Sequence, residues 1–356
     1  MIGERIKIAR RRSGLNLRQL AEQVKVSATE ISKYERGQDV PSSGVLIKLA
    51  HALGVRIEYF LRPVTVSLSQ PNYRSHASKL RAKDKKIIQA KVQDWLERYL
   101  LIEELVSKQG GFQFPDILRR VERAEDVEQV AVKLRHSWEL GLGPIDHLAE
   151  ILEARGIKVG MVKGVGDFDS LMLWANNKTI PVIVVKEDIS GDRQRFNMAH
   201  ELGHLILEIP SGWNEKQIEK AAFRFAGAFL APAQTVQEEL GAKRQRLDLH
   251  ELQLLKQKYG LSMQAWIYRA KDLGILPEAR AQALFKEFRA KGWHREEPGD
   301  PYPPEKLDRL ERLVRRALAE ELISDARAAE ILGMSPSQLW MQASWQHEPI
   351  PTQANR

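Results

Sequence analysis

The pentapeptide His200-Glu201-Leu202-Gly203-His204 limits what this 356-residue chain can fold into more than any other feature of its sequence. Histidines four residues apart lie on one face of an α-helix, about one turn apart, so both imidazoles can bind a single metal ion. Glu201 follows the first histidine, in a position from which its carboxylate can reach a water held by that metal. The pattern therefore predicts a helix that carries a metal site.

The surroundings of this helix predict an α+β domain. We expect the helix to begin near Gly191, with Asp192 as its cap, and Gly203 to let another element approach closely. The side chains predicted to bury it are Phe196, Leu202, Leu205 and Ile206. Upstream, short β-branched and apolar runs predict a small sheet, joined in part by a turn at 176–178. The predicted strands are 157–162, 171–174 and 181–185, and the predicted helices before them are 127–138 and 145–154.

The third metal ligand has to be a histidine or a carboxylate, because the chain has no cysteine. The same absence excludes disulfide frameworks, thiolate zinc sites and cysteine nucleophiles. A catalytic zinc takes three protein ligands and leaves its fourth position to water. The candidates downstream are Glu219, Glu215, Glu208 and His250, and spacing alone does not choose among them.

The first 62 residues form a basic unit of short helices. They contain 12 Lys and Arg against 6 Asp and Glu, a net charge of +6, whereas residues 131–356 are neutral. Ser27 is predicted to cap the third helix, with Glu30 as its capping-box partner. Two short helices separated by a tight turn indicate a helix-turn-helix, and the charge indicates a polyanionic partner. The predicted helices are 2–12, 17–24, 28–36, 45–53 and 57–61.

This segment resembles the XRE, or lambda-repressor-like, DNA-binding domain. The resemblance lies in Leu17-(x2)-Leu20-Ala21-(x4)-Val26-Ser27-(x3)-Ile31-Ser32-(x2)-Glu35-(x)-Gly37, followed by Pro41 and Leu46-(x2)-Leu49-Ala50-(x2)-Leu53. The outward residues at the start of the third helix are then expected to contact base edges of double-stranded DNA: Ala28, Thr29, Ser32 and Lys33. Arg18, Gln19 and Arg36 are placed for phosphates, and Gln38 and Ser43 for further backbone contacts.

A second resemblance covers roughly residues 130–290. Arg195-Phe196-(x2)-Ala199-His200-Glu201-Leu202-Gly203-His204-Leu205-(x)-Leu207, then Glu219-(x2)-Ala222-(x2)-Phe225-Ala226-(x3)-Leu230-(x)-Pro232, is similar to the ImmA/IrrE family of metallopeptidases. The resemblance implies zinc bound by His200, His204 and Glu219, with Glu201 moving the proton. Phe223 departs from the family, which usually has Asn or Asp there, so a partner that supports a ligand is expected to be missing or supplied elsewhere, which affects catalysis more than zinc binding.

The rest of the chain is predicted to be connecting and helical. Residues 63–84 have no sustained periodicity and indicate a linker, followed by a long helix from Lys85 to about Lys108. Residues 296–304 are a proline-rich joint, and 307–322 an amphipathic helix. Residues 324–335 resemble the first half of a second helix-turn-helix, whose neutral charge favours docking or dimerisation over DNA binding. The predicted domains are 1–62, 63–128, 129–295 and 304–356.

These features predict a DNA-binding transcription regulator that carries a zinc-dependent endopeptidase domain. The resemblances imply a DNA operator, a protein or peptide substrate such as a partner repressor or toxin, and control of stress, mobile-element or toxin–antitoxin genes. The alternative is an antitoxin or repressor whose zinc domain binds or senses without proteolysis. A homodimer is a further expectation. No segment has the ~18 apolar residues of a membrane span, and none reads as a signal peptide, so a cytoplasmic protein is expected.

Overall fold

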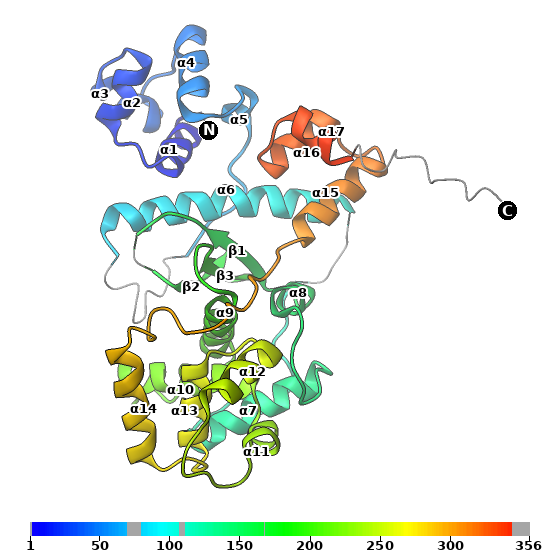
Figure 1. Cartoon of the computed structure of the whole chain (residues 1–356). Helices are drawn as coiled ribbons and strands as arrows, with labels where there is room; N and C mark the ends of the chain where they lie inside the picture. Colours follow the sequence, from blue (N-terminus) through cyan, green and yellow to red (C-terminus); the bar gives the residue numbers. More distant parts are fainter. Residues whose placement is uncertain (1, 70–79, 107–110, 167, 344–356) are drawn as a thin grey trace, which may run out of the picture.

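The computed structural model describes residues 2–69, 80–106, 111–166 and 168–343 (Figure 1). The middle of the predicted 63–84 linker and the end of the C-terminal tail lie outside the described residues. The described chain is mostly helical with one three-stranded sheet, which confirms the α+β prediction. None of the described helices is long and apolar enough to span a membrane.

The N-terminal domain has five short helices around a core of its own. Ser27 accepts from the backbone N–H of Glu30, and the Glu30 carboxylate accepts from the N–H of Ser27, so the predicted capping box is confirmed. Lys25, in the left-handed conformation, ends the helix before it. The helices are α1 Ile2–Arg12, α2 Leu17–Val24, α3 Ala28–Glu35, α4 Ser43–Leu53 and α5 Glu58–Leu61.

The long helix α6, Ala82–Val106, lies between this domain and the sheet (Figure 1). Its apolar face, which includes Ile88, Val92 and Leu96, packs on one side of the sheet. The opposite face turns two buried carboxylates, Asp94 and Glu97, toward α1. One helix therefore joins the two domains.

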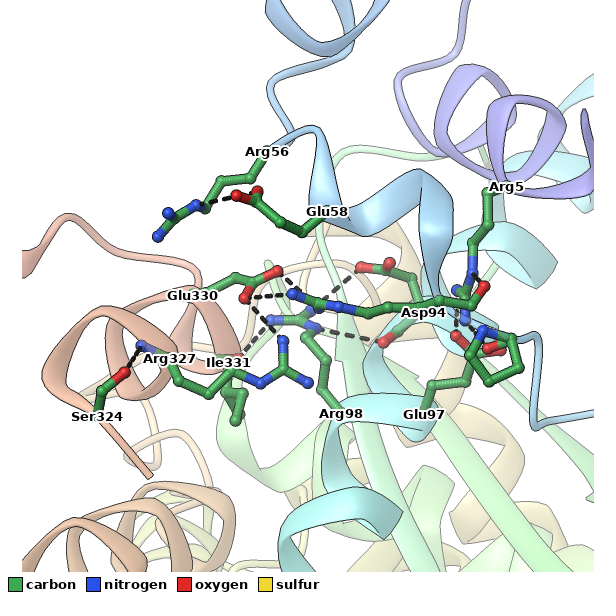
Figure 2. Close-up of polar contacts among 12 residues, drawn as sticks. Arg5, Arg56, Glu58, Asp94, Glu97, Arg98, Ser324, Arg327, Glu330 and Ile331 are labelled. Carbon is green, nitrogen blue, oxygen red and sulfur yellow. Dashed lines mark hydrogen bonds and ion pairs between the residues drawn. The ribbon is translucent and has the colours of Figure 1, made fainter. Parts of the chain in front are cut away.

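Arginine–carboxylate contacts make this junction (Figure 2). Arg5 of α1 donates to Glu97, and Arg12 Nη1 lies 2.8 Å from Asp94 Oδ2. Arg62, which follows α5, lies 2.7 Å from Glu330 in the C-terminal part of the chain. The apolar core of the N-terminal domain is separate from the core beneath α6, so charge contacts are prominent where the two meet.

The sheet has the order β1-β3-β2. β3 pairs in parallel with β1 and antiparallel with β2, with Val159 and Met172 both opposite Ile183. Alternate side chains of β3 face α6 on one side and, on the other, α9 (Gly191–Ile206), the helix that contains His200 and His204, because successive residues of a strand point to opposite faces. The strands are β1 Lys158–Val162, β2 Ser170–Ala175 and β3 Ile180–Lys186, and α9 spans Gly191–Ile206.

Part of the predicted linker belongs to this sheet. Leu68 bridges Ala175 in antiparallel fashion, and the backbone N–H of Ser69 donates to the Trp174 carbonyl at 2.8 Å. Val66 is buried against the face that α6 covers. Residues 66–69 therefore run along β2 in the direction of Ser170, its first residue.

The remaining helices between Ala124 and Ala290 surround α9, and together with α9 and the sheet they are called the metal domain below. They are α7 Ala124–Ser137, α8 Leu148–Ala154, α10 Glu215–Leu230, α11 Ala233–Leu240, α12 Leu249–Tyr259, α13 Met263–Asp272 and α14 Glu278–Ala290. The core they share with α9 and the sheet is the largest of the molecule. It holds α9 and α10, which carry the site residues, against each other.

The C-terminal helices pack on the far end of α6, against Tyr99 and Ile102. α16 and α17 have eight residues each, as α2 and α3 do, and the turn between them contains Gly333 in the left-handed conformation. Ser335 and Gln338 exchange the same capping bonds as Ser27 and Glu30. The resemblance to a helix-turn-helix thus extends to both helices, and the unit docks on its own chain. The helices are α15 Arg309–Ala319, α16 Asp325–Leu332 and α17 Pro336–Ala343.

The prediction that Asp192 caps α9 is wrong. Ser190 is the N-cap residue, and Asp192 is buried inside the first turn, 3.9 Å from Lys256 Nζ. The proline-rich joint fixes this turn instead: the Gly191 N–H donates to the Tyr302 carbonyl at 3.1 Å. A Cβ on Gly191 would collide with the backbone of Pro303. Sequence spacing missed this because the contact comes from residues far along the chain.

Glu305 completes the brace on α9. Its carboxylate pairs with Arg195 and accepts from the backbone N–H groups of Leu148 and Ala149 at 3.4 and 3.2 Å. Both members of the ion pair are buried. Glu305 therefore caps α8 and anchors α9 at once, which positions the helix that carries the two histidines.

Candidate metal centre and nucleic-acid interface

The two histidines of α9 converge on one point. The Nε2 atoms of His200 and His204 lie 3.1 Å apart, as their spacing of four residues predicts for one helix face. His200 is buried and His204 is half-buried. A pair of ring nitrogens held so close favours a shared cation over two separate partners.

Glu219 reaches the same point from α10. Its carboxylate oxygens lie 3.3 Å from His200 Nε2 and 3.3 Å from His204 Nε2. The two helices come this close because Gly203 faces Ala222 and Phe225, where an added Cβ would lie 3.1–3.3 Å from its neighbours. Among the described residues His200, His204 and Glu219 form a potential metal-binding group with ligand atoms within 4.8 Å, and it includes none of Glu208, Glu215 and His250.

Buried polar atoms without partners show that this group suits a cation. Glu219 is buried, with 7% of its surface exposed, yet neither of its carboxylate oxygens has a hydrogen-bond partner among the described residues. Burial alone would raise the pKa of Glu219, but the neighbouring His200 and His204 lower it well below its usual range. Two imidazoles and an ionised carboxylate are a donor set that zinc prefers.

Glu201 lies beside the group, fixed by a residue that the sequence analysis missed. Its Oε1 accepts a hydrogen bond from Ser170 Oγ at 2.7 Å. Ser170 begins β2, 31 residues before Glu201, so no local spacing connects the two. The serine orients the carboxylate that follows the first histidine.

Phe223 occupies the outer side of His200. Its ring centroid lies 4.3 Å from that of His200, and it stacks on Phe196 at 6.0 Å. His200 Nδ1 is buried without a hydrogen-bond partner among the described residues. Histidine ligands usually donate their second N–H to a carboxylate, carbonyl or water, so here aromatic packing takes the place of a polar support.

A cavity of about 220 Å³ opens beside His204, between α9 and α10. It is lined by Gly203, His204, Leu207, Ile209, Ile218 and Ala222. Of the three potential ligands, His204 lines this cavity.

The predicted DNA contacts lie on the surface of the N-terminal domain. Thr29 and Lys33 of α3 are exposed, whereas Ala28 and Ser32 are half-buried. Arg36 is exposed and donates from Nε to the Ser32 carbonyl at 3.2 Å.

The start of α2 and the loop after α3 are also at the surface. Arg18 and Gln19 are exposed, although the Gln19 side chain accepts from the Asn16 N–H and so caps α2. Gln38 and Ser43 are exposed as well. These residues, together with Thr29 and Lys33, are therefore exposed to solvent.

The structure places several arginines of this domain in internal ion pairs. Arg10 pairs with Glu35 of α3, while Arg5, Arg12 and Arg62 pair with carboxylates outside the domain. The net charge of +6 therefore overstates the positive charge that faces outward. Sequence counting could not separate the two kinds of arginine.

Family comparisons agree with both parts of this description. Residues 6–60 match the family model described as Helix-turn-helix, and residues 153–271 match the model described as IrrE N-terminal-like domain. No curated protein matches the chain. The predicted fusion is confirmed: one chain carries a helix-turn-helix domain of DNA-binding regulators and a domain of a zincin-like peptidase family.

Proposed function

We propose that this protein, which joins a helix-turn-helix to a zincin-like domain, is a DNA-binding transcription regulator with a zinc-dependent endopeptidase. The observation that carries the proposal is the convergence of His200, His204 and Glu219, with Glu201 beside them. The proposed partners are a double-stranded operator, bound by a homodimer, and a partner repressor or toxin as substrate. The proposed targets are stress, mobile-element or toxin–antitoxin genes.

The residues divide the chemistry in a simple way. Zinc held by His200, His204 and Glu219 would polarise the scissile carbonyl and make water a stronger nucleophile. Glu201 takes the proton of the attacking water and passes it to the leaving nitrogen. Ser170 holds the Glu201 carboxylate through a 2.7 Å hydrogen bond from its hydroxyl.

The substrate is a partner protein or the chain itself, cut within 63–84. The cavity beside His204 gives a substrate side chain room next to the metal group. Residues 66–69 run along β2 toward Ser170, so the chain already approaches the site from the helix-turn-helix side. A cut there would separate the DNA-binding domain from the rest of the protein.

Glu201→Gln tests proteolysis. The variant keeps the metal ligands and the exposed DNA-binding residues, so zinc content and DNA binding should stay unchanged. Loss of general acid–base catalysis typically lowers the rate by ~10²–10⁴, so cleavage of the repressor or of the chain itself should disappear. The measurement is gel analysis of cleavage by zinc-loaded protein together with elemental analysis of zinc.

A binding-only function is the second candidate, and the surroundings of His200 favour it. The unpartnered Nδ1 and the covering Phe223 replace the polar support that ligating histidines usually have. Loss of such a support typically lowers metal affinity or activity about 10–100-fold, and in this candidate function the site binds or senses zinc without proteolysis. Equal regulation by the unchanged protein and by Glu201→Gln in cells would favour this candidate, whereas loss of regulation would favour proteolysis.

A further inference from the structure

Helix α6 carries its charges in two blocks. Residues 81–92 contain five Lys and Arg and one Asp, whereas residues 93–106 contain four Asp and Glu and one Arg. This order opposes the helix dipole, which favours acidic residues in the first turn and basic residues in the last. In the acidic block, Asp94 and Glu97 pair with arginines of α1, and Glu103 pairs with Lys158.

Lys83 and Lys86 are the exposed lysines of the basic block. Arg81 is paired with Asp84, and Lys91 donates to the Lys163 carbonyl, but neither Lys83 nor Lys86 forms an ion pair within the described part of the chain. They are therefore two available cations, less than one helical turn apart.

Lys83 places the basic block of α6 close to the helix-turn-helix domain. Lys83 lies on the same face of α6 as Ile87 and Asp94, the residues that meet the N-terminal domain. A Cβ on Gly14, in the loop between α1 and α2, would lie 3.5 Å from Ile87 Cδ1. Lys83 is one turn before Ile87, so it lies close to that loop. Figure 1 shows the first turns of α6 beneath α1 and α3.

The same loop leads directly into the surface predicted to bind phosphates. Asn16 at its end caps α2, and Arg18 and Gln19 follow in the first turn. Arg5, Arg10, Arg12 and Arg62 pair with carboxylates. The exposed cations of the helices and loops near this surface are Arg18, Lys25, Lys33 and Arg36. Beyond the loop between α1 and α2, Lys83 and Lys86 of α6 would add two exposed cations to this set.

We propose that Lys83 and Lys86 of α6 bind the phosphate backbone of the duplex that the helix-turn-helix engages. The inference rests on the proposed DNA binding and extends the protein–DNA interface beyond residues 6–60 onto the helix that connects the two domains. These contacts add affinity for any sequence and carry no base specificity, because lysine binds phosphate as a point charge.

The salt dependence of DNA binding tests the proposal in the full-length protein. Binding of a labelled duplex of random sequence is measured over a series of salt concentrations. Removal of one phosphate-binding lysine lowers the slope of log K against log salt by about 1, so Lys83→Ala/Lys86→Ala should lower it by about 2. Alanine is compatible with a helix, so α6 should remain folded, which circular dichroism checks.

Lys216→Ala/Lys220→Ala is the matched control, because both lysines are exposed on α10 in the metal domain. It removes the same charge and should leave the slope unchanged. Lys83→Arg/Lys86→Arg should restore the slope of the unchanged protein.

Three results would count against the proposal. An unchanged slope in Lys83→Ala/Lys86→Ala overturns it. Equal decreases of the slope in the α6 and α10 variants overturn it too, because the effect would then come from net charge. Absence of binding by the unchanged protein would instead overturn the proposed DNA-binding function itself, and this inference with it.

Discussion

The helix-turn-helix domain and the metal domain present their functional side chains in opposite ways. Arg18, Thr29 and Lys33 stand at the surface of short helices that share a closed core of their own. His200 and Glu219 are buried between α9 and α10, and Glu305 braces α9 from a distant part of the chain. Substitution of the exposed contact residues should therefore leave the fold of the first domain intact. The geometry of the metal site, in contrast, depends on how its whole domain packs.

The largest effect should come from removing a ligand of the metal domain. His204→Ala should abolish zinc binding, and Glu219→Ala should weaken it strongly, because the site has three protein ligands. Elemental analysis should find about one zinc per chain in the unchanged protein. Glu208→Ala is the control, since Glu208 lies outside the metal-binding group and pairs with Arg119. Full zinc content in both ligand variants would contradict the site.

The next largest effect is on the free energy of unfolding, and it should differ between two arginine–glutamate pairs. Glu305→Gln leaves Arg195 buried without a charged partner, which should cost about 3–5 kcal/mol of unfolding free energy. Glu330→Gln breaks the more exposed pair with Arg62 and should cost below about 1 kcal/mol. Urea denaturation followed by circular dichroism measures both. Similar losses of stability in the two variants would show that the buried pair in the metal domain contributes no more than the pair at the junction with the N-terminal domain.

A buried carboxyl should make the metal domain sensitive to pH. Glu153 of α8 accepts from the Tyr99 hydroxyl at 2.9 Å, near the Lys158–Glu103 pair and Arg309, and burial raises its pKa to about 7. The folded protein then holds this proton more tightly than the unfolded chain does.

Stability should therefore fall as the pH rises from about 4.5 to 7 and then level off, by roughly 3 kcal/mol for this group. Glu153→Gln should lose this dependence, and thermal unfolding across pH 4–8 tests it. A pH dependence that persists unchanged in Glu153→Gln would show that another group causes it.

The smallest effects belong to the helix-turn-helix domain. Thr29→Ala and Lys33→Ala should each relax the preference for the operator by about 1–3 kcal/mol, the usual value of a base contact. Arg18→Ala should weaken all sequences alike. Competition binding with operator and unrelated DNA measures both. None of the three should change thermal stability, because all are exposed; a fall in stability would contradict the separation of fold from binding in this domain.

Local sequence patterns predicted the features that depend on residues close together in the chain. The capping box at Ser27 and the convergence of His200 and His204 follow from spacings of three and four residues in a helix. The apolar face of α6 follows from the same periodicity. Glu219 lies on a different helix, so it took a family resemblance to select it over its rivals.

Contacts between segments far apart in the sequence could not be predicted from local patterns. Ser170 orients Glu201 across 31 residues, and Glu305 reaches Arg195 across 110. Val66 is buried in a segment that has no sequence periodicity. This segment adds only an isolated bridge, at Leu68, to an existing sheet and forms no regular element of its own. Asp192 resembles a cap in sequence, yet Ser190 is the N-cap residue and the helix begins at Gly191.

The long reach of Glu305 also sets an order of events while the chain is being made. The helix-turn-helix core involves only residues near the start of the chain and can close as soon as they leave the ribosome. Arg195 must wait for Glu305, and at about 5–20 residues per second the stretch from Arg62 to Glu305 takes roughly 10–50 s to synthesise. The nascent protein thus displays a finished DNA-binding domain before its metal domain is complete, and it can meet DNA in that state.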